Sequence, residues 1–132
     1  MGMRRCSAPG MAGLTTVING NCGLSAAPAE GVYREEILRY LAPIVGKLPR
    51  GWEFPTMASY LRQVKAVPLP LNVGMLVGMG TLRANVAGFQ NGPLSAEQLQ
   101  KLHALLEQTL ADGALGVSLG LGYAPECFYT TE

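Results

Sequence analysis

Three short apolar runs, each followed directly by a glycine-containing loop, most constrain how this chain can fold. The runs are 14–18, 71–77 and 114–119, and the loops are 20–28, 78–83 and 120–126. β-Branched runs of this length, bounded by glycine and asparagine, are typical of buried strands. With the helical segments between them, they predict the order strand, loop, two helices, strand, two helices, strand, loop. This alternation favours an α/β fold with a parallel sheet, in which the functional loops follow the carboxyl ends of the strands.

Three segments have the periodicity of helices: 32–45, 56–67 and 95–113. Thr56 is the predicted N-cap of the second, and Ser95 opens the third with glutamine three residues later, as in a capping box. Apolar residues at helical spacing are expected to face the core. They are Val32, Ile37, Leu38, Leu41 and Ile44 in the first segment, Met57, Tyr60, Leu61 and Val64 in the second, and Leu99, Leu102, Leu106 and Leu110 in the third.

Composition excludes several classes of function. The chain has 132 residues, enough for one domain, and Lys+Arg 10 against Asp+Glu 9 leaves a net charge of +1. No basic patch marks a nucleic-acid binder. No run is long and apolar enough to span a membrane, and the N-terminus has no secretory apolar core. Charged residues make up 14% of the chain, which suits a core-rich α/β protein or a piece cut from one.

Cysteine and histidine supply few candidates for chemistry. The cysteines are Cys6, Cys22 and Cys127, and an odd number without close spacing predicts reduced thiols and a cytoplasmic protein. From the residues alone, Cys22 on its strand-end loop is either a small buried thiol or a metal ligand. Cys6 and Cys127 are expected to be plain thiols. His103 is the only histidine, and we expect it on a helix surface, where it makes no site.

The three strand-and-loop motifs together resemble a known family. They read TTVINGNCG at 15–23, NVGMLVGMGTLR at 72–83 and GALGVSLGLGYAPECFYTTE at 113–132. In this order and spacing they resemble the N-acyl-D-amino-acid deacylases, or D-aminoacylases, of the zinc-dependent amidohydrolase superfamily. WEFPTMASYLRQV at 52–64 looks like the family's aromatic stretch. The resemblance implies a TIM barrel, a zinc cofactor and hydrolysis of the amide bond of small N-acyl-D-amino acids.

The resemblance also assigns roles to individual residues. Cys22 stands where the family has a cysteine zinc ligand, and Tyr123 where it has a tyrosine that contacts substrate. Arg83 is a candidate either for clamping its own loop or for binding a substrate carboxylate. Met79 stands where the family has a histidine, and its thioether can neither transfer a proton nor donate a hydrogen bond. No catalytic residue is expected within this segment.

The family pattern further implies that residues 1–132 form a single partial barrel domain, a fragment. The family's His-x-His strand would precede Gly2, and two further histidines and a catalytic aspartate would follow Glu132. A whole barrel needs about 200–250 residues, so this chain would supply about three of its βα units. A zinc site needs roughly three or four protein ligands, so we expect no zinc on this chain alone. Open sheet edges would favour self-association.

Alternatives to this reading remain open. One is a non-catalytic α/β fragment that folds by self-association, and another is part of a hydantoinase-like or dihydroorotase-like amidohydrolase. A small doubly wound binding domain, with a ligand at the strand-end loops, is a further option. Zinc content and turnover of an N-acyl-D-amino acid distinguish these alternatives. In every case we expect neither nucleic acid nor a membrane as partner.

Overall fold

The computed structural model describes residues 13–46, 48 and 51–130, and Cys6 lies outside them. The strands are β1 (Thr16–Asn19), β2 (Asn72–Met75), β3 (Val77–Gly78) and β4 (Val117–Ser118). The helices are α2 (Arg34–Val45), α3 (Met57–Lys65), α4 (Met79–Ala87) and α5 (Ala96–Ala111), with 3-10 turns η2 (Gly31–Tyr33) and η3 (Glu126–Phe128). This mixture of alternating strands and helices confirms the predicted α/β class.

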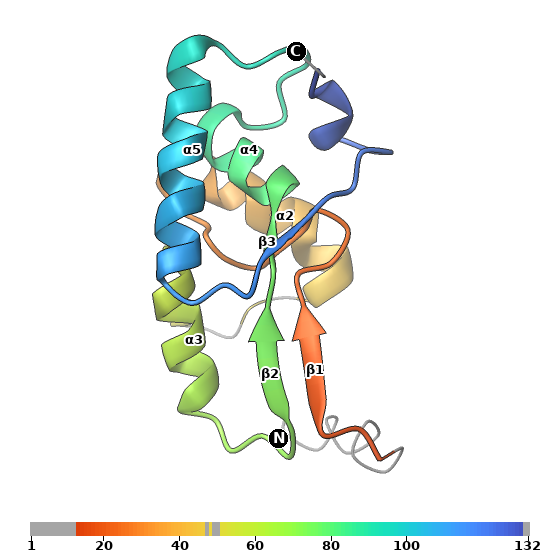
Figure 1. The fold of residues 1–132 in the computed structure, drawn as a ribbon, viewed down its shortest axis with the longest axis vertical. Coiled ribbons are helices and arrows are strands. Elements are labelled where there is room, and N and C mark those ends of the chain that lie inside the picture. The colour runs from red at the N-terminus through yellow and green to blue at the C-terminus, as the bar shows by residue number, and fades with distance from the viewer. Residues whose placement is uncertain (1–12, 47, 49–50, 131–132) are drawn as a thin grey trace.

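The strands form two parallel pairs that follow each other in space (Figure 1). β1 pairs with β2 from Thr16 opposite Asn72 to Asn19 opposite Met75, and β3 pairs with β4. The second predicted strand is interrupted at Leu76, whose N–H donates to the Asn19 carbonyl at 2.8 Å. Parallel pairing requires a crossover between the partners, and the helices provide it.

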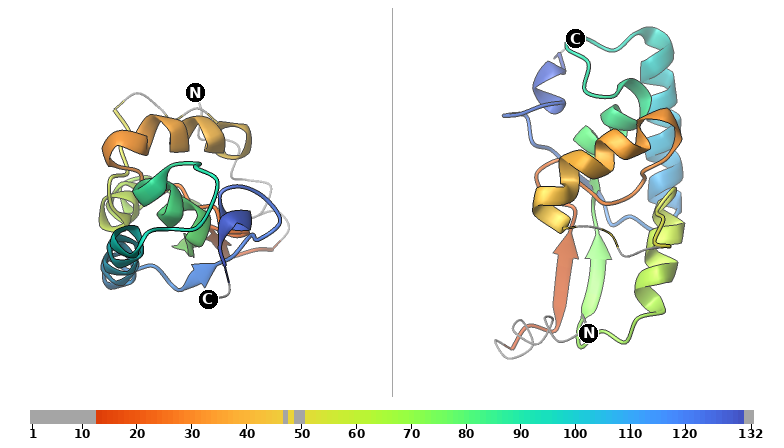
Figure 2. Two further views of the ribbon diagram at one scale, coloured as in Figure 1. Left: turned by 90° about the horizontal axis from the view of Figure 1, so that it is seen from above. Right: turned by 180° about the vertical axis from the view of Figure 1, so that it is seen from behind.

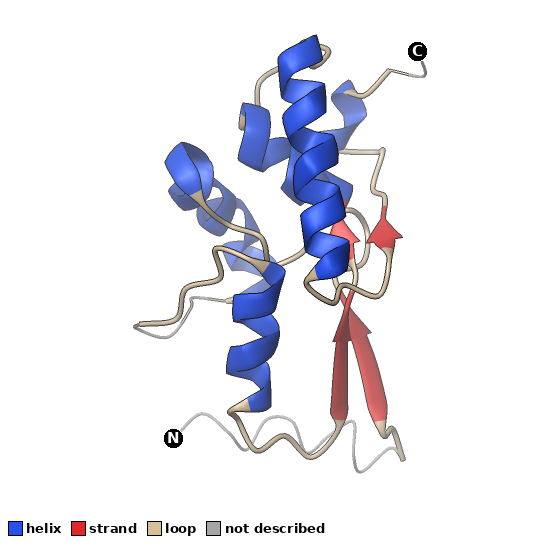
Figure 3. Ribbon diagram, turned by 60° about the vertical axis from the view of Figure 1, so that its left-hand side comes forward, coloured by secondary structure: helices blue, strands red, loops and turns tan. Residues whose placement is uncertain are grey.

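The helices cover the strands unevenly. α3 and α5 follow one another along one side of the strands (Figure 1), and α2 crosses obliquely in the view from behind (Figure 2). α4 contacts both α2 and α5 and so connects α2 to the side of the molecule on which α3 and α5 lie. The β1–β2 pair extends beyond α4 and α5, and its side away from α3 is bare (Figure 3). No helix within the described ranges is long and apolar enough to cross a bilayer.

The buried apolar side chains form two clusters. The larger joins α3, β2, β3, α4 and α5 and contains Ala27, Phe54, Met57, Tyr60, Met75, Val77, Leu82 and Leu102. The smaller lies between α2 and α4 and contains Ala29, Ile37, Leu41 and Ala84. Burial of a large apolar side chain contributes about 1.5–3 kcal/mol, so these clusters hold the helices to β2 and β3.

The prediction that the first strand is buried is wrong, and the third strand is exposed as well. Ile18 in β1 is 50% exposed and Val117 in β4 is 47% exposed. A parallel strand is fully buried only when both of its faces are covered and both of its edges are paired. In the described residues β1 and β4 each have one neighbouring strand, so an apolar sequence alone cannot bury them.

The interpretation of 78–83 as a strand-end loop is also wrong, because α4 begins at Met79 immediately after β3. Thr81, Leu82 and Arg83 are buried within it. A Cβ on Gly78 would overlap the main chain of Gly23, so glycine permits this close approach. A helix that is buried on all sides has no polar stripe, and its periodicity is therefore invisible in the sequence.

Both predicted helix caps are confirmed. The Thr56 hydroxyl accepts from Ser59 N at 3.1 Å, and the Ser95 hydroxyl accepts from Gln98 N at 3.2 Å; each pair completes a capping box. These contacts satisfy N–H groups that the first helical turn leaves without partners. Local chemistry therefore fixes where α3 and α5 begin.

The predicted apolar stripes are correct only in part. Met57 and Tyr60 in α3, Ile37 and Leu41 in α2, and Leu102 in α5 are buried. Val32, Ile44, Leu99 and Leu110 are instead exposed, with Val32 at 92%. These four positions lie at helix ends or outer faces that no described element covers.

Candidate functional site

The turn after β1 places Cys22 in an unusual main-chain conformation. Its φ is 56°, in the left-handed region, and it is the one non-glycine residue described with a positive φ. Its side chain is exposed. A left-handed conformation in a non-glycine residue costs on the order of 1–3 kcal/mol and persists only where the surroundings enforce it. The contacts of this turn are therefore central to the site.

Residues of β4 and of the loop after it hold the turn from one side. The Ser118 hydroxyl donates to the Gly20 carbonyl and accepts from Gly23 N at 3.0 Å. The Tyr123 hydroxyl donates to the main-chain carbonyl of Cys22. Main-chain groups on both sides of Cys22 are thus bonded to side chains from a distant part of the sequence.

The start of α4 holds the same turn from the other side. Thr81 N donates to the Gly23 carbonyl at 3.2 Å, and the Thr81 hydroxyl accepts from Ser25 N at 2.9 Å. The Ser25 hydroxyl accepts from Gly78 N at 3.1 Å. The carboxyl ends of β1, β3 and β4 therefore meet at one place, as the parallel arrangement predicted.

Glu126 lies buried beneath this junction and was missed by the sequence analysis. Its side chain is 1% exposed, and its carboxylate accepts hydrogen bonds from Gly80 N and Gly120 N. A Cβ on Gly23 would overlap the same carboxylate. The available signal was an acidic residue in a glycine-rich segment behind a predicted strand.

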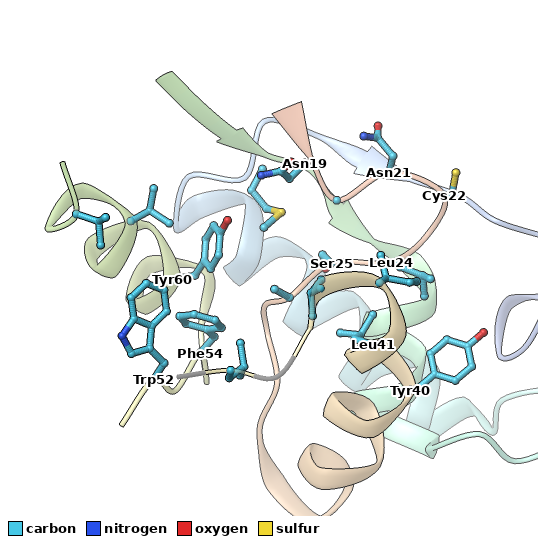
Figure 4. A pocket seen from close by; sticks show the side chains of 18 of the residues that line it. Asn19, Asn21, Cys22, Leu24, Ser25, Tyr40, Leu41, Trp52, Phe54 and Tyr60 are labelled. Atoms are coloured by element: carbon cyan, nitrogen blue, oxygen red, sulfur yellow. The ribbon is translucent and has the colours of Figure 1, made fainter. Parts of the chain in front are cut away.

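A pocket of about 970 Å³ opens beside the turn (Figure 4). Its wall includes Trp52, Phe54 and Tyr60, whose rings pack edge to face, with centroids 5.8 Å apart for the first pair and 5.1 Å for the second. The described residues that line it include no charged side chain. Cys22 lies at the rim, with its sulfur directed away from the aromatic rings. The pocket therefore suits an apolar group, and the thiol faces elsewhere.

Tyrosines near the turn remain protonated donors. Burial raises the pKa of Tyr60, and a side-chain hydrogen bond with Asn19 partly offsets it. Desolvation raises the pKa of Tyr123, and the neighbouring charges of Cys22 and Glu126 raise it further. A phenol titrates near pH 10 when unperturbed, so both hydroxyls can donate hydrogen bonds at neutral pH.

Arg83 is fully inside the molecule, at 1% exposed. One guanidinium nitrogen donates to the Gly92 carbonyl at 2.5 Å and the Gln90 carbonyl at 3.4 Å, while Nε and Nη1 have no hydrogen-bond partner among the described residues. The guanidinium carbon lies 5.1 Å from the Tyr129 ring centroid and 5.9 Å from that of Phe128. These contacts are those of a side chain that joins the α4 helix to its following turn and to the C-terminal segment.

The structure therefore brings together Cys22 and Tyr123 but not Arg83, which does not line the pocket. Met79 packs against the larger core cluster, and its carbonyl accepts from the Tyr129 hydroxyl at 3.1 Å. His103 is exposed on α5, as expected.

The residues at the turn do not by themselves make a zinc site. Within the part of the chain that the structure describes, no group of three or more histidine, cysteine, aspartate or glutamate side chains is placed to hold a metal. Cys22 provides one exposed thiol, whereas zinc takes roughly three or four protein ligands. The geometry supplies one exposed thiol on a turn that several hydrogen bonds hold.

Comparison with known proteins finds deacylases among the chain's relatives, although no family model matches the chain. A D-aminoacylase of Alcaligenes xylosoxydans xylosoxydans is 34% identical over 120 residues, which are 91% of this chain and 24% of the relative. An N-acyl-D-aspartate deacylase of the same organism is 36% identical over 91% of this chain and 23% of its own length. The chain thus spans about a quarter of the curated relatives that it matches.

Solved structures agree. A D-aminoacylase studied for its binuclear metal centre superimposes with a TM-score of 0.76 and 32% identity, over 97% of this chain and 26% of that protein. An N-acyl-D-glutamate deacylase of Bordetella bronchiseptica, complexed with zinc and a phosphonate inhibitor, superimposes with a TM-score of 0.68 and 28% identity. The superposition covers 89% of this chain and 24% of that protein. Another D-aminoacylase, described as defining a subset of amidohydrolases, superimposes with a TM-score of 0.72 and 29% identity. By sequence and by fold, this chain is similar to N-acyl-D-amino-acid deacylases over about a quarter of their length.

Proposed function

We propose that this chain is part of a zinc-dependent amidohydrolase that hydrolyses the amide bond of N-acyl-D-amino acids, and that Cys22 is one of its metal ligands. The observation that carries the proposal is the Cys22 turn, a left-handed cysteine with an exposed thiol at the junction of three strand ends. Strand-end loops are where barrel enzymes place their chemistry. The relatives named above carry the corresponding activity.

In this proposal the described strands and helices are about three βα units of a TIM barrel. The exposed sides of β1 and β4 support this view, because in a closed barrel each strand has two neighbours. The residues of this chain bind and orient: Cys22 offers a thiolate, and Tyr123 fixes the turn while its half-exposed ring remains accessible to substrate. No proton transfer is assigned to them.

Arg83 is better supported as a structural residue than as a substrate contact. Its guanidinium is enclosed by Tyr129, Phe128 and two carbonyl groups. We retain a substrate role for Tyr123 alone. We also propose a cytoplasmic protein, because an odd number of cysteines without close spacing predicts reduced thiols.

The decisive experiment joins the full chain to the remainder of a relative. The 132 residues replace the aligned quarter of the Alcaligenes D-aminoacylase, and the purified chimera is tested for bound zinc and for hydrolysis of N-acetyl-D-leucine. We expect both, and we expect Cys22→Ala to abolish turnover and reduce bound zinc. Cys127→Ala is the matched control, because Cys127 is also an exposed thiol. Hydantoin, a cyclic amide, tests the hydantoinase-like alternative.

Retention of zinc and turnover by a folded Cys22→Ala chimera would contradict the ligand assignment. Turnover by the isolated chain, with stoichiometric zinc, would contradict its description as a partial site. Circular dichroism establishes that each chimera is folded before either conclusion is drawn.

The second candidate is a non-catalytic α/β fragment that self-associates. Exposed apolar side chains on and beside β1 and β4 favour it, namely Ile18, Leu115, Val117, Leu119 and Leu121. Unpaired strand edges next to such side chains favour pairing with another chain. Analytical ultracentrifugation of the full chain tests this candidate: a concentration-dependent oligomer that Leu119→Lys dissociates supports it, and a monomer at all concentrations excludes it.

A further inference from the structure

We propose that Glu126 is the positioning residue of the Cys22 turn: its carboxylate fixes the strand-end junction and so sets where the thiol lies. Its role in metal binding rests on the proposed function, whereas its role in shaping the turn does not. The sequence alone assigned Glu126 no functional role.

Two backbone donors from different elements converge on the carboxylate. Oε1 accepts from Gly80 N, and Oε2 accepts from Gly120 N. Gly80 belongs to α4 and Gly120 follows β4, so one side chain joins two segments that are far apart in sequence. Hydrogen bonds to an ionised carboxylate are roughly twice as strong as neutral ones.

The position of the carboxylate at α4 is electrostatically favourable. Gly80 is the second residue of this nine-residue helix, whose N-cap, Gly78, has no side chain to cap it. The first N–H groups of a helix have no partners within the helix, and the helix dipole favours a negative charge there. Glu126 therefore does what a capping aspartate does elsewhere, although it comes from 46 positions away.

The turn packs directly on this carboxylate. Gly23, next to Cys22, has a φ of 71°, and a Cβ added to it would meet the carboxyl group of Glu126. The absence of a side chain at Gly23 is what lets the turn descend onto the buried charge. The Gly23 carbonyl also accepts from Thr81 N at 3.2 Å. Movement of the carboxylate is therefore expected to shift both the turn at Gly23 and the start of α4.

The isosteric substitution Glu126→Gln tests the proposal in the full chain. Glutamine replaces one of the two carboxylate oxygens with an NH2 donor, so in the same position one of the two glycine N–H groups loses its acceptor. The measurements are the amide proton shifts of Gly80 and Gly120 and the rate at which iodoacetamide alkylates Cys22, with Cys6 and Cys127 replaced by serine. We expect at least one glycine amide to move upfield and the alkylation rate to change severalfold. Glu107→Gln, on the exposed side of α5, is the matched control and should alter neither.

Unchanged glycine amide shifts and an unchanged alkylation rate in folded Glu126→Gln would overturn the proposal. Glu126→Asp keeps the charge but shortens the reach, and partial recovery of the shifts relative to Glu126→Gln supports a charge-mediated clamp. Should one variant not fold, the coupling between Gly23→Ala and Glu126→Ala decides. The proposal requires the combined loss of stability to be smaller than the sum of the two, and simple additivity contradicts it.

The metal arm uses the chimera described above. Loss of a residue that orients a metal ligand typically weakens metal binding by about 10–100-fold, and we expect Glu126→Gln to lower zinc affinity in that range. If neither the wild-type chimera nor its variants bind zinc, the proposed function is rejected. The amide shifts of Gly80 and Gly120 still test whether Glu126 holds the turn. Wild-type zinc affinity in Glu126→Gln, with altered shifts, would contradict the link between clamp and metal.

Discussion

Tyr123 donates a hydrogen bond from its hydroxyl to the main-chain carbonyl of Cys22, joining residues that lie 101 positions apart. The carbonyl belongs to the one non-glycine residue with a left-handed φ in the described chain. A side chain from far along the sequence therefore helps to hold the left-handed conformation of Cys22, together with the bonds made by Gly20 and Gly23.

Removal of this hydroxyl by Tyr123→Phe should loosen the turn. A single hydrogen bond contributes about 0.5–1.5 kcal/mol, and the exposure of Tyr123 places the loss at the low end. Urea unfolding measures this change, and faster alkylation of Cys22 relative to Cys127 reports the local effect. Tyr33→Phe serves as the control, because no hydrogen bond of its hydroxyl is found among the described residues. Equal alkylation rates in Tyr123→Phe and wild type would contradict the prediction.

Gly23→Ala should be markedly more harmful than Gly31→Ala. Both glycines are left-handed, with φ of 71° and 68°, so both substitutions carry a main-chain cost of roughly 1–2 kcal/mol. Only at Gly23 would the added Cβ also meet the Glu126 carboxylate, since a Cβ at Gly31 has no atom of another described segment within 4 Å. Overpacking adds about 1–3 kcal/mol. Chemical denaturation of the two variants measures the difference, and similar losses would show that the turn has room.

Local sequence was sufficient where local contacts decide the structure. Thr56 and Ser95 begin their helices because their hydroxyls bond to nearby N–H groups. The order of strands and helices required parallel pairing, and that pairing is present. The resemblance to the deacylases likewise rested on residues read directly from the chain.

Sequence was insufficient where burial depends on distant elements. Ile18 is apolar but half exposed, because no described element covers its side of β1. Two helices were expected between the second and third strands, but the first of them, α4, could not be placed because it is buried all round and has no polar stripe. Glu126 was passed over because its partners are two main-chain N–H groups, which leave no trace in side-chain composition.

Leu102 and Leu99 on α5 provide a test of the corrected helix orientation. Leu102 is 2% exposed, and Leu102→Ala should cost about 2–5 kcal/mol through lost burial and a cavity. Leu99 is 44% exposed, and Leu99→Ala should change stability by no more than about 0.5 kcal/mol. Thermal unfolding distinguishes them. A large loss at Leu99 would mean that a further chain covers this face in solution.

Alkaline pH should destabilise the fold in part through Tyr129. Burial raises its pKa to about 12, with the Glu126 charge adding to the increase and Arg83 opposing it. The unfolded phenol titrates near 10, so the folded state binds this proton more tightly. Its contribution to stability is complete below pH 10 and is lost as the pH rises through 12.

The check is urea unfolding at pH 9 and pH 11. Tyr129→Phe removes this titration, and it should lose less stability than wild type between the two pH values. The same variant should have a somewhat smaller free energy of unfolding than wild type at pH 9, because it lacks the hydrogen bond from the Tyr129 hydroxyl to the Met79 carbonyl. An identical decline in both proteins would assign the alkaline loss to other groups.

The long-range bonds around the Cys22 turn also set the order of events during synthesis. Ser118, Tyr123 and Glu126 are made roughly 100 residues after the turn that they support. Contacts of such large sequence separation form late in folding, because the loop-closure entropy must be overcome first. During synthesis the segment that contains Cys22 is therefore expected to leave the ribosome unfolded. The Cys22 turn forms only after the residues from Ser118 to Glu126 have been made.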